Sequence, residues 1–211
     1  GRTKMTGSGV PDRGMAGVTG SGAPDNRSLV EQLVKAGVPL TGFFALTSVC
    51  NFRCPMCYAV DCRIGTGNGV DRDERGQTGF VDGDTWISLM QQARDAGMLQ
   101  VVLTGGEPLL HPDFPRILKY LSGYGVFFWL NTNASLITES MADLLAQYPP
   151  RGMQVSLYAA SDEVSTRMCG HRDAWRKAVA GIDLLLARRL KVDLRTTIVR
   201  QNLSDLESLW Q

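Results

Sequence analysis

Histidine, a charge excess and long hydrophobic runs are all scarce in this chain of 211 residues. The formal net charge is +1, so nothing favours a nucleic acid or an acidic membrane surface as a partner. No apolar run is long enough to span a bilayer, and the first residues are not followed by the apolar segment of a secretory signal. We therefore expect a soluble protein that binds neither nucleic acid nor membrane.

The chain has only two histidines, and neither is predicted to be a catalytic base. His111 comes just before a predicted helix, where a loop or capping role is expected. His171 lies in a predicted turn between Gly170 and Arg172.

Five cysteines are present, and three of them follow a C-x3-C-x2-C spacing: Cys50, Cys54 and Cys57. An odd, clustered set suits metal ligation better than a disulfide framework, and thiolates that must stay reduced indicate a cytoplasmic setting. Three thiolates on one short loop predict an iron–sulfur cluster with one iron left open for another ligand, whereas four would close it. A competing interpretation adds Cys62 as a fourth ligand, giving a zinc site or a closed cluster. Cys169 is expected to be an incidental buried thiol.

The hydrophobic pattern divides the chain into a leader and an alternating strand–helix region. Residues 1–27 are rich in Gly, Ser, Pro and Asp, and they predict a flexible leader. Ser28 is expected to cap a short helix that ends at Lys35. Beyond it, the pattern predicts strands at residues 43–47, 99–103, 126–130, 153–157 and 192–199, and helices at about 84–97, 112–121, 138–147, 174–189 and 202–211.

Strands separated by helices require parallel pairing through crossover connections, so the chain is predicted to be α/β. In such folds the functional residues gather at the carboxyl ends of the strands, which is where the cysteines and the other polar motifs fall. Five β/α units are fewer than a closed eight-fold barrel needs, and residue 211 falls within a predicted helix. We therefore expect residues 28–211 to be an incomplete barrel, with a further domain missing after them.

A second motif, Gly105-Gly106-Glu107-Pro108, follows the second predicted strand. Two glycines let the backbone adopt unusual dihedral angles and approach a ligand closely. Glu107 adds a carboxylate that could hold a cationic group.

Together with Ser156-Leu157-Tyr158, these two motifs resemble those of the radical S-adenosylmethionine (radical SAM) superfamily over about residues 40 to 211. The resemblance implies a partial TIM-like (β/α)6 barrel that holds a [4Fe–4S] cluster on Cys50, Cys54 and Cys57. It implies that SAM binds the open iron and is cleaved reductively to methionine and a 5′-deoxyadenosyl radical, which abstracts a substrate hydrogen. A low-potential electron donor of the flavodoxin or ferredoxin type is the implied partner.

The resemblance also assigns contacts to SAM. Gly105, Gly106 and Glu107 match the stretch that binds the methionyl amino group, and Ser156 matches a polar position near the ribose or carboxylate. Arg167 resembles the basic residue that pairs with the SAM carboxylate, with Arg172 as a weaker candidate. Asn131 and Thr132 would line the same cavity. Met56 departs from the family, which usually has an aromatic residue or histidine before the third cysteine.

Within the superfamily, Cys57-Tyr58 and the stretch from Ser156 to Ser161 are similar to enzymes with a C-terminal SPASM domain, an oxidoreductase group that modifies peptide or protein side chains. Relatives that act on cofactor precursors, nucleotides or tetrapyrroles share the same amino-terminal half, so these substrates stay open. A non-catalytic iron–sulfur or zinc module on Cys50, Cys54, Cys57 and Cys62 is the alternative from another class.

Overall fold

The computed structural model describes residues 26–58 and 80–210. The elements run in the order α1 (Asn26–Lys35), β1 (Thr41–Ala45), α2 (Gly83–Asp95), β2 (Gln100–Thr104), η1 (Pro108–Leu110), α3 (Phe114–Gly123), β3 (Phe127–Thr132), α4 (Glu139–Gln147), β4 (Gly152–Ser156), α5 (Asp162–Cys169), α6 (Ala174–Ala187), β5 (Val192–Arg195), η2 (Arg200–Asp205) and α7 (Leu206–Trp210). The described helices include none that is both long and apolar enough to cross a membrane.

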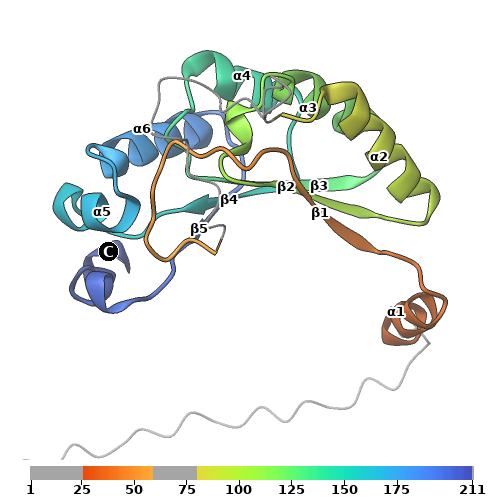
Figure 1. Ribbon diagram of the computed structural model, residues 1–211, viewed down its shortest axis with the longest axis horizontal. Helices are drawn as coiled ribbons and strands as arrows, with labels where there is room; N and C mark the ends of the chain where they lie inside the picture. The colour runs from red at the N-terminus through yellow and green to blue at the C-terminus, as the bar shows by residue number, and fades with distance from the viewer. Residues whose placement is uncertain (1–25, 59–79, 211) are drawn as a thin grey trace, which may run out of the picture.

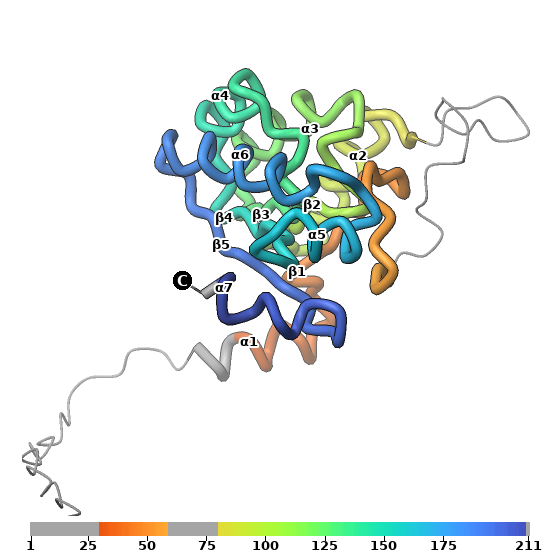
Figure 2. Tube along the Cα trace, turned by 90° about the vertical axis from the view of Figure 1, so that its left-hand side faces the viewer, coloured from red at the N-terminus to blue at the C-terminus, as the bar shows by residue number. Residues whose placement is uncertain are grey.

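The five strands form one parallel sheet in the order β1-β2-β3-β4-β5. Each strand pairs with its neighbour in the sequence, so every crossover steps one place in the same direction. Helices α2, α3, α4 and α6 lie on one side of this sheet, while α1 and α7 lie on the other (Figures 1 and 2). This is the expected α/β architecture of a partial barrel.

The main core fills the space between the sheet and its helical layer. Leu103, Leu130 and Met153 are adjacent in the strand register and fully buried, and they meet side chains such as Leu118 and Leu145 from the helices. Burying one such side chain contributes about 1.5–3 kcal/mol, so this layer holds the strands in register. Their carboxyl ends are thereby fixed at one edge.

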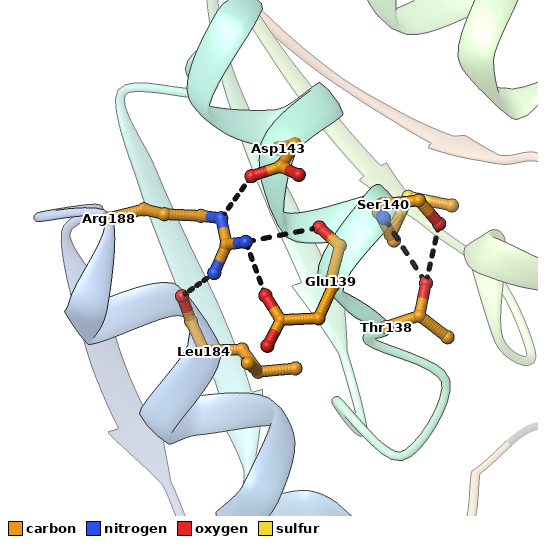
Figure 3. A network of polar contacts seen from close by, with 7 residues as sticks. Thr138, Glu139, Ser140, Asp143, Leu184 and Arg188 are labelled. Carbon is orange, nitrogen blue, oxygen red and sulfur yellow. Dashed lines mark hydrogen bonds and ion pairs between the residues drawn. The ribbon is translucent and has the colours of Figure 1, made fainter.

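One ion-pair network ties two covering helices together. Arg188, just after α6, donates to Glu139 and Asp143 of α4 at 2.5 and 2.6 Å, and to the carbonyl oxygen of Leu184 at 3.1 Å (Figure 3). The network lies on the helical layer and joins α4 to the end of α6.

Most predicted elements are confirmed within a few residues, but two predictions were wrong. The last strand ends at Arg195 rather than at residue 199, because the Asn202 side chain binds the main chain of Tyr158, Thr197 and Val199 and draws this segment off the sheet. The predicted helix over 202–211 is instead the 3-10 turn η2 followed by the short α7.

One helix was not predicted, and another begins earlier than expected. Helix α5 was missed, although Ser161 caps its start and Gly170, with φ of 62°, ends it, both of which are recognisable signals. Helix α1 begins at Asn26, two residues before the predicted cap at Ser28. The rest of the predicted leader lies outside the described residues.

Candidate functional site

A cavity of about 280 Å³ lies at the carboxyl ends of the strands. Segments that follow all five strands contribute to its wall. The lining residues are Cys50, Phe52, Cys54, Met56, Cys57, Tyr58, Thr104, Gly105, Gly106, Asn131, Thr132, Asn133, Ser156, Tyr158 and Thr197. The structure therefore brings the three cysteines, the two glycines, Asn131 and Ser156 together around one space.

The three predicted cluster ligands sit on a short loop after β1. Cys50 and Cys54 are half-buried, and Cys57 is exposed. The loop folds back on itself, since the Cys57 N–H donates to the Cys54 carbonyl oxygen at 3.1 Å and the Phe52 N–H donates to Cys50 Sγ at 3.4 Å. Phe52 is buried between the cysteines and anchors the loop to the apolar cluster around α5.

A second anchor joins this loop to the end of α5. The Arg53 N–H donates to the carbonyl oxygen of Cys169 at 2.7 Å. At the next position, Gly170 packs so closely that a Cβ there would stand 2.9 Å from the Arg53 carbonyl oxygen. The missed helix α5 therefore forms the support behind the cysteine loop.

The segment between β1 and the cysteine loop, residues 46–49, packs against the Gly-Gly turn. The Gly106 N–H donates to the Thr47 carbonyl oxygen, and the Glu107 N–H donates to that of Val49, both at 2.8 Å. A Cβ on Gly105 would lie 2.4 Å from the Thr47 carbonyl oxygen, and one on Gly106 would lie 2.3 Å from that of Val49. Gly105 also has a φ of 138°, which side chains disfavour. The two glycines are thus required for this close packing, while their main chain lines the cavity.

The Glu107 carboxylate does not line the cavity, because it is fully buried inside the wall. It accepts hydrogen bonds from the Thr132 hydroxyl at 2.7 Å, the Asn133 N–H at 2.8 Å and the Leu109 N–H at 3.2 Å. Burial raises the pKa of Glu107 to about 7, against these hydrogen bonds, which favour the charged form. The carboxylate joins the loops after β2 and β3, so any role in holding an amino group rests on the main chain around it.

Two further predicted residues line the cavity, and one does not. Ser156, the last residue of β4, lines the cavity. Asn131, one residue before the end of β3, also lines it, and its Oδ1 is buried without a hydrogen-bond partner among the described residues. Arg167 instead pairs with Glu163 at 2.7 Å. It lines a separate, smaller cavity of about 140 Å³ beside Met56. The assigned contact between Arg167 and a carboxylate therefore stays a prediction.

The surroundings of two of the cysteines, Cys50 and Cys54, favour the neutral thiol. Burial raises the pKa of Cys50 to about 11. A hydrogen bond with the Cys169 thiol, followed by burial, raises the pKa of Cys54. Thiolate is the form that binds iron, so iron binding by Cys50 or Cys54 would require loss of the thiol proton.

The residues around the cavity fit an iron–sulfur cluster with a small polar ligand. Among residues 26–58 and 80–210, no group of three or more His, Cys, Asp or Glu side chains is arranged to hold a single metal ion. Each thiolate of a four-iron cluster binds its own iron, so the thiols need only line one cavity, as these do. The Oδ1 of Asn131 has no hydrogen-bond partner within residues 26–58 and 80–210, and it is suited to accept a hydrogen bond from an ammonium or hydroxyl group.

The remaining predictions about single residues have mixed outcomes. His111 has the expected capping role, because its Nδ1 accepts from the Asp113 N–H at 3.1 Å and its Nε2 donates to the Val81 carbonyl oxygen at 2.8 Å. Arg172 is exposed and does not line the cavity. Cys62 lies outside the described residues.

Several residues that shape the site were not predicted from the sequence. Asn51, Asn133 and Ser135 form a hydrogen-bonded triangle behind the cysteine loop. Thr197 reaches the cavity only because Asn202 redirects the chain after β5. The polar run after β3 was a usable signal for Asn133 and Ser135, whereas nothing local indicated Thr197.

The fold and the site together define an α/β half-barrel with a three-cysteine loop at the carboxyl edge of its sheet. The profile of the Radical SAM superfamily matches residues 44–209, and the chain belongs to this superfamily. Members of the superfamily use a [4Fe–4S] cluster and SAM.

Curated relatives include enzymes with different substrates. The chain is 27% identical over 175 residues to a PqqA peptide cyclase of Bradyrhizobium diazoefficiens, which covers 83% of this chain and 43% of that protein. It is 26% identical over 166 residues to an AdoMet-dependent heme synthase of Methanosarcina barkeri, covering 79% and 44%. The chain thus spans less than half the length of these relatives.

Among solved structures, Streptococcus suis SuiB bound to the precursor peptide SuiA is similar with a TM-score of 0.67 and 20% identity. The match covers 87% of this chain and 39% of SuiB. The structure of native anSMEcpe with bound AdoMet has a TM-score of 0.55 and 18% identity, covering 74% of this chain and 43% of that one. These similarities show that the fold is shared.

Proposed function

We propose that this chain is the cofactor-binding part of a radical SAM enzyme that modifies a peptide or protein side chain. One observation carries the proposal: three cysteines on the loop after β1 line the same cavity as the polar ends of β2, β3 and β4. When bound, the cluster and SAM supply a 5′-deoxyadenosyl radical that abstracts a substrate hydrogen. The chain's own residues then have to bind the cluster and SAM, orient them and shield the radical.

The roles of these residues follow from their positions. Cys50, Cys54 and Cys57 hold the cluster, and their loop is fixed from below by the Gly105-Gly106 turn. The main chain of this turn faces the cavity and offers polar groups to the methionyl end of SAM. The buried Glu107 side chain fixes the turn to the loop after β3.

Residues at the ends of the later strands complete the proposed SAM site. Asn131 offers an amide oxygen as an acceptor, and Ser156 offers a hydroxyl on the neighbouring strand. Arg167 would reach the SAM carboxylate only after leaving Glu163, which is feasible because this ion pair is largely exposed and therefore weak.

A peptide substrate is the proposed class because three of the relatives described as PqqA peptide cyclases share 26–28% identity with this chain. A tetrapyrrole is the second candidate, favoured by the heme synthase relative. The reaction needs a low-potential electron donor, for which we propose a flavodoxin or ferredoxin type, and a reducing compartment such as the cytoplasm would preserve the thiols.

The first experiment measures SAM cleavage. The chain is reconstituted anaerobically with iron and sulfide, reduced with dithionite and given SAM, and 5′-deoxyadenosine is quantified beside a Cys57→Ala control. Product in the unmutated chain that is lost in the control supports the proposal; a tightly held zinc and no cluster would contradict it. Adding a pool of peptides or a tetrapyrrole then shows which class raises product above the substrate-free rate.

Iron content distinguishes the enzyme from a closed metal module. Under our proposal Cys62→Ala retains its iron and Cys54→Ala loses it. Equal loss in both variants would indicate a four-cysteine site and exclude the open iron that SAM requires.

A further inference from the structure

A triangle of polar side chains connects the cysteine loop with the loop after β3. Asn51 Nδ2 donates to Ser135 Oγ at 2.8 Å, and Asn133 Nδ2 donates to Asn51 Oδ1 at 2.9 Å. Ser135 Oγ in turn donates to Asn133 Oδ1 at 2.6 Å. The Nδ2 donor and the Oδ1 acceptor of the Asn51 amide are therefore both hydrogen-bonded. These bonds fix the orientation of this side chain, which lies between two proposed cluster ligands in the sequence.

Asn133 extends the triangle to the Gly-Gly turn. Its side chain holds Asn51, while its N–H donates to Glu107 Oε2 at 2.8 Å. Asn133 is 8% exposed and Glu107 is fully buried, so water cannot easily replace these bonds. A continuous path of hydrogen bonds therefore runs from the cysteine loop through Asn133 to the turn that carries Gly105 and Gly106.

We propose that Asn51 and Asn133 are positioning residues that hold the cluster loop in register with the SAM-binding turn. This inference rests on the proposed function. A ligand that binds the open iron at one end and the turn at the other requires both to be fixed relative to each other within a fraction of an ångström. The cysteine loop has no regular secondary structure of its own, so tertiary hydrogen bonds must supply this precision.

The location of the triangle separates positioning from general stability. Asn133 lines the cavity, and Asn51 lies between Cys50 and Phe52, which also line it. Thr41 and Gln100 make a comparable side-chain hydrogen bond of 3.0 Å between β1 and β2 at the opposite, amino edge of the sheet. Loss of that bond should leave SAM binding unaffected, so Gln100→Ala is a matched control.

The test uses the full chain, reconstituted anaerobically, with Asn51→Ala, Asn133→Ala and the double variant. Two quantities are measured: iron per chain, and the SAM concentration that gives half of the SAM-induced change in the electron paramagnetic resonance spectrum of the reduced cluster. We expect unchanged iron and a half-saturating SAM concentration raised about tenfold in each single variant. The increase in the double variant should be smaller than the product of the two single increases, because both single variants remove the bond between Asn51 and Asn133.

Two more variants make the test independent of folding losses. Asn51→Asp can still accept from Asn133 but cannot donate to Ser135, so it should show a smaller increase than Asn51→Ala. Ser135→Ala removes the third corner at a half-buried position and should also raise the half-saturating concentration, even if Asn51→Ala fails to fold.

The outcomes distinguish this inference from the proposed function. An unmutated chain whose spectrum does not respond to SAM would refute the proposed function and, with it, the inference. If the unmutated chain responds but the variants have its half-saturating concentration, or lose iron in step with folded protein, Asn51 and Asn133 are structural residues only.

Discussion

Replacing Glu107 by glutamine should remove a distinct pH dependence from the stability of the cluster-free chain. The carboxyl group is fully buried, and burial raises its pKa from 4.5 in an exposed setting to about 7 in the folded chain. Below pH 4.5 the group is protonated in both states and contributes nothing. Between 4.5 and about 7 the unfolded chain releases the proton and the folded chain keeps it, so the free energy of unfolding falls as the pH rises.

The size of this effect follows from the two pKa values. Each tenfold difference in acidity corresponds to 1.36 kcal/mol, so a rise from 4.5 to about 7 lowers the stability by about 3 kcal/mol once the pH exceeds 7. The amide of Glu107→Gln does not ionise, so the variant should lack this decrease. Its lost hydrogen bonds lower stability by an amount that does not depend on pH.

Urea unfolding of the cluster-free chain under reducing conditions, at pH values from about 4 to 8, measures both curves. The difference between unmutated chain and Glu107→Gln should change by about 3 kcal/mol across this range. Glu207→Gln, at an exposed position, should follow the unmutated chain. Parallel curves for the chain and Glu107→Gln would show that Glu107 does not titrate as its burial requires.

Two further substitutions test the close packing and the helical layer. Gly106→Ala should lower both the unfolding midpoint and the iron content, because its Cβ would meet the Val49 carbonyl oxygen at 2.3 Å. The control Gly123→Ala should lower neither, because its Cβ would have nothing within 4 Å. Equal effects of the two variants in calorimetry and iron analysis would contradict the packing argument. Arg188→Ala should lower the unfolding midpoint, because it removes the ion pairs with Asp143 and Glu139. Added salt screens these ion pairs, so it should reduce the difference in unfolding midpoint between the variant and the unmutated chain. A difference that does not depend on salt would indicate that packing of the arginine side chain matters instead.

Much of the fold was readable from the sequence because its signals are local. The strand predicted over residues 126–130 has apolar residues on both faces, which is typical of a parallel sheet covered by helices. The C-x3-C-x2-C spacing and the Gly-Gly-Glu turn are also local, so residue order alone sufficed to place the cluster loop and its neighbour at strand ends.

The errors arose where distant contacts override local preference. The chain from Thr196 onward has strand-like residues, yet the Asn202 side chain binds it outside the sheet. Sequence alone also does not indicate whether a carboxylate after a strand, such as that of Glu107, points into a cavity or into the wall. Its three partners lie in two different loops.

The sequence by itself determined the α/β class, the three-cysteine motif and the position of the polar motifs at one edge of a sheet. Residue spacing and hydrophobic period depend only on neighbours along the chain. Only the tertiary structure decided that Asn51 meets Asn133 and that Cys54 meets Cys169. It also decided that Gly106 packs against the segment that leads into the cysteine loop. These contacts join residues that are tens of positions apart, and their partners are selected by the packing of the whole sheet against its helices.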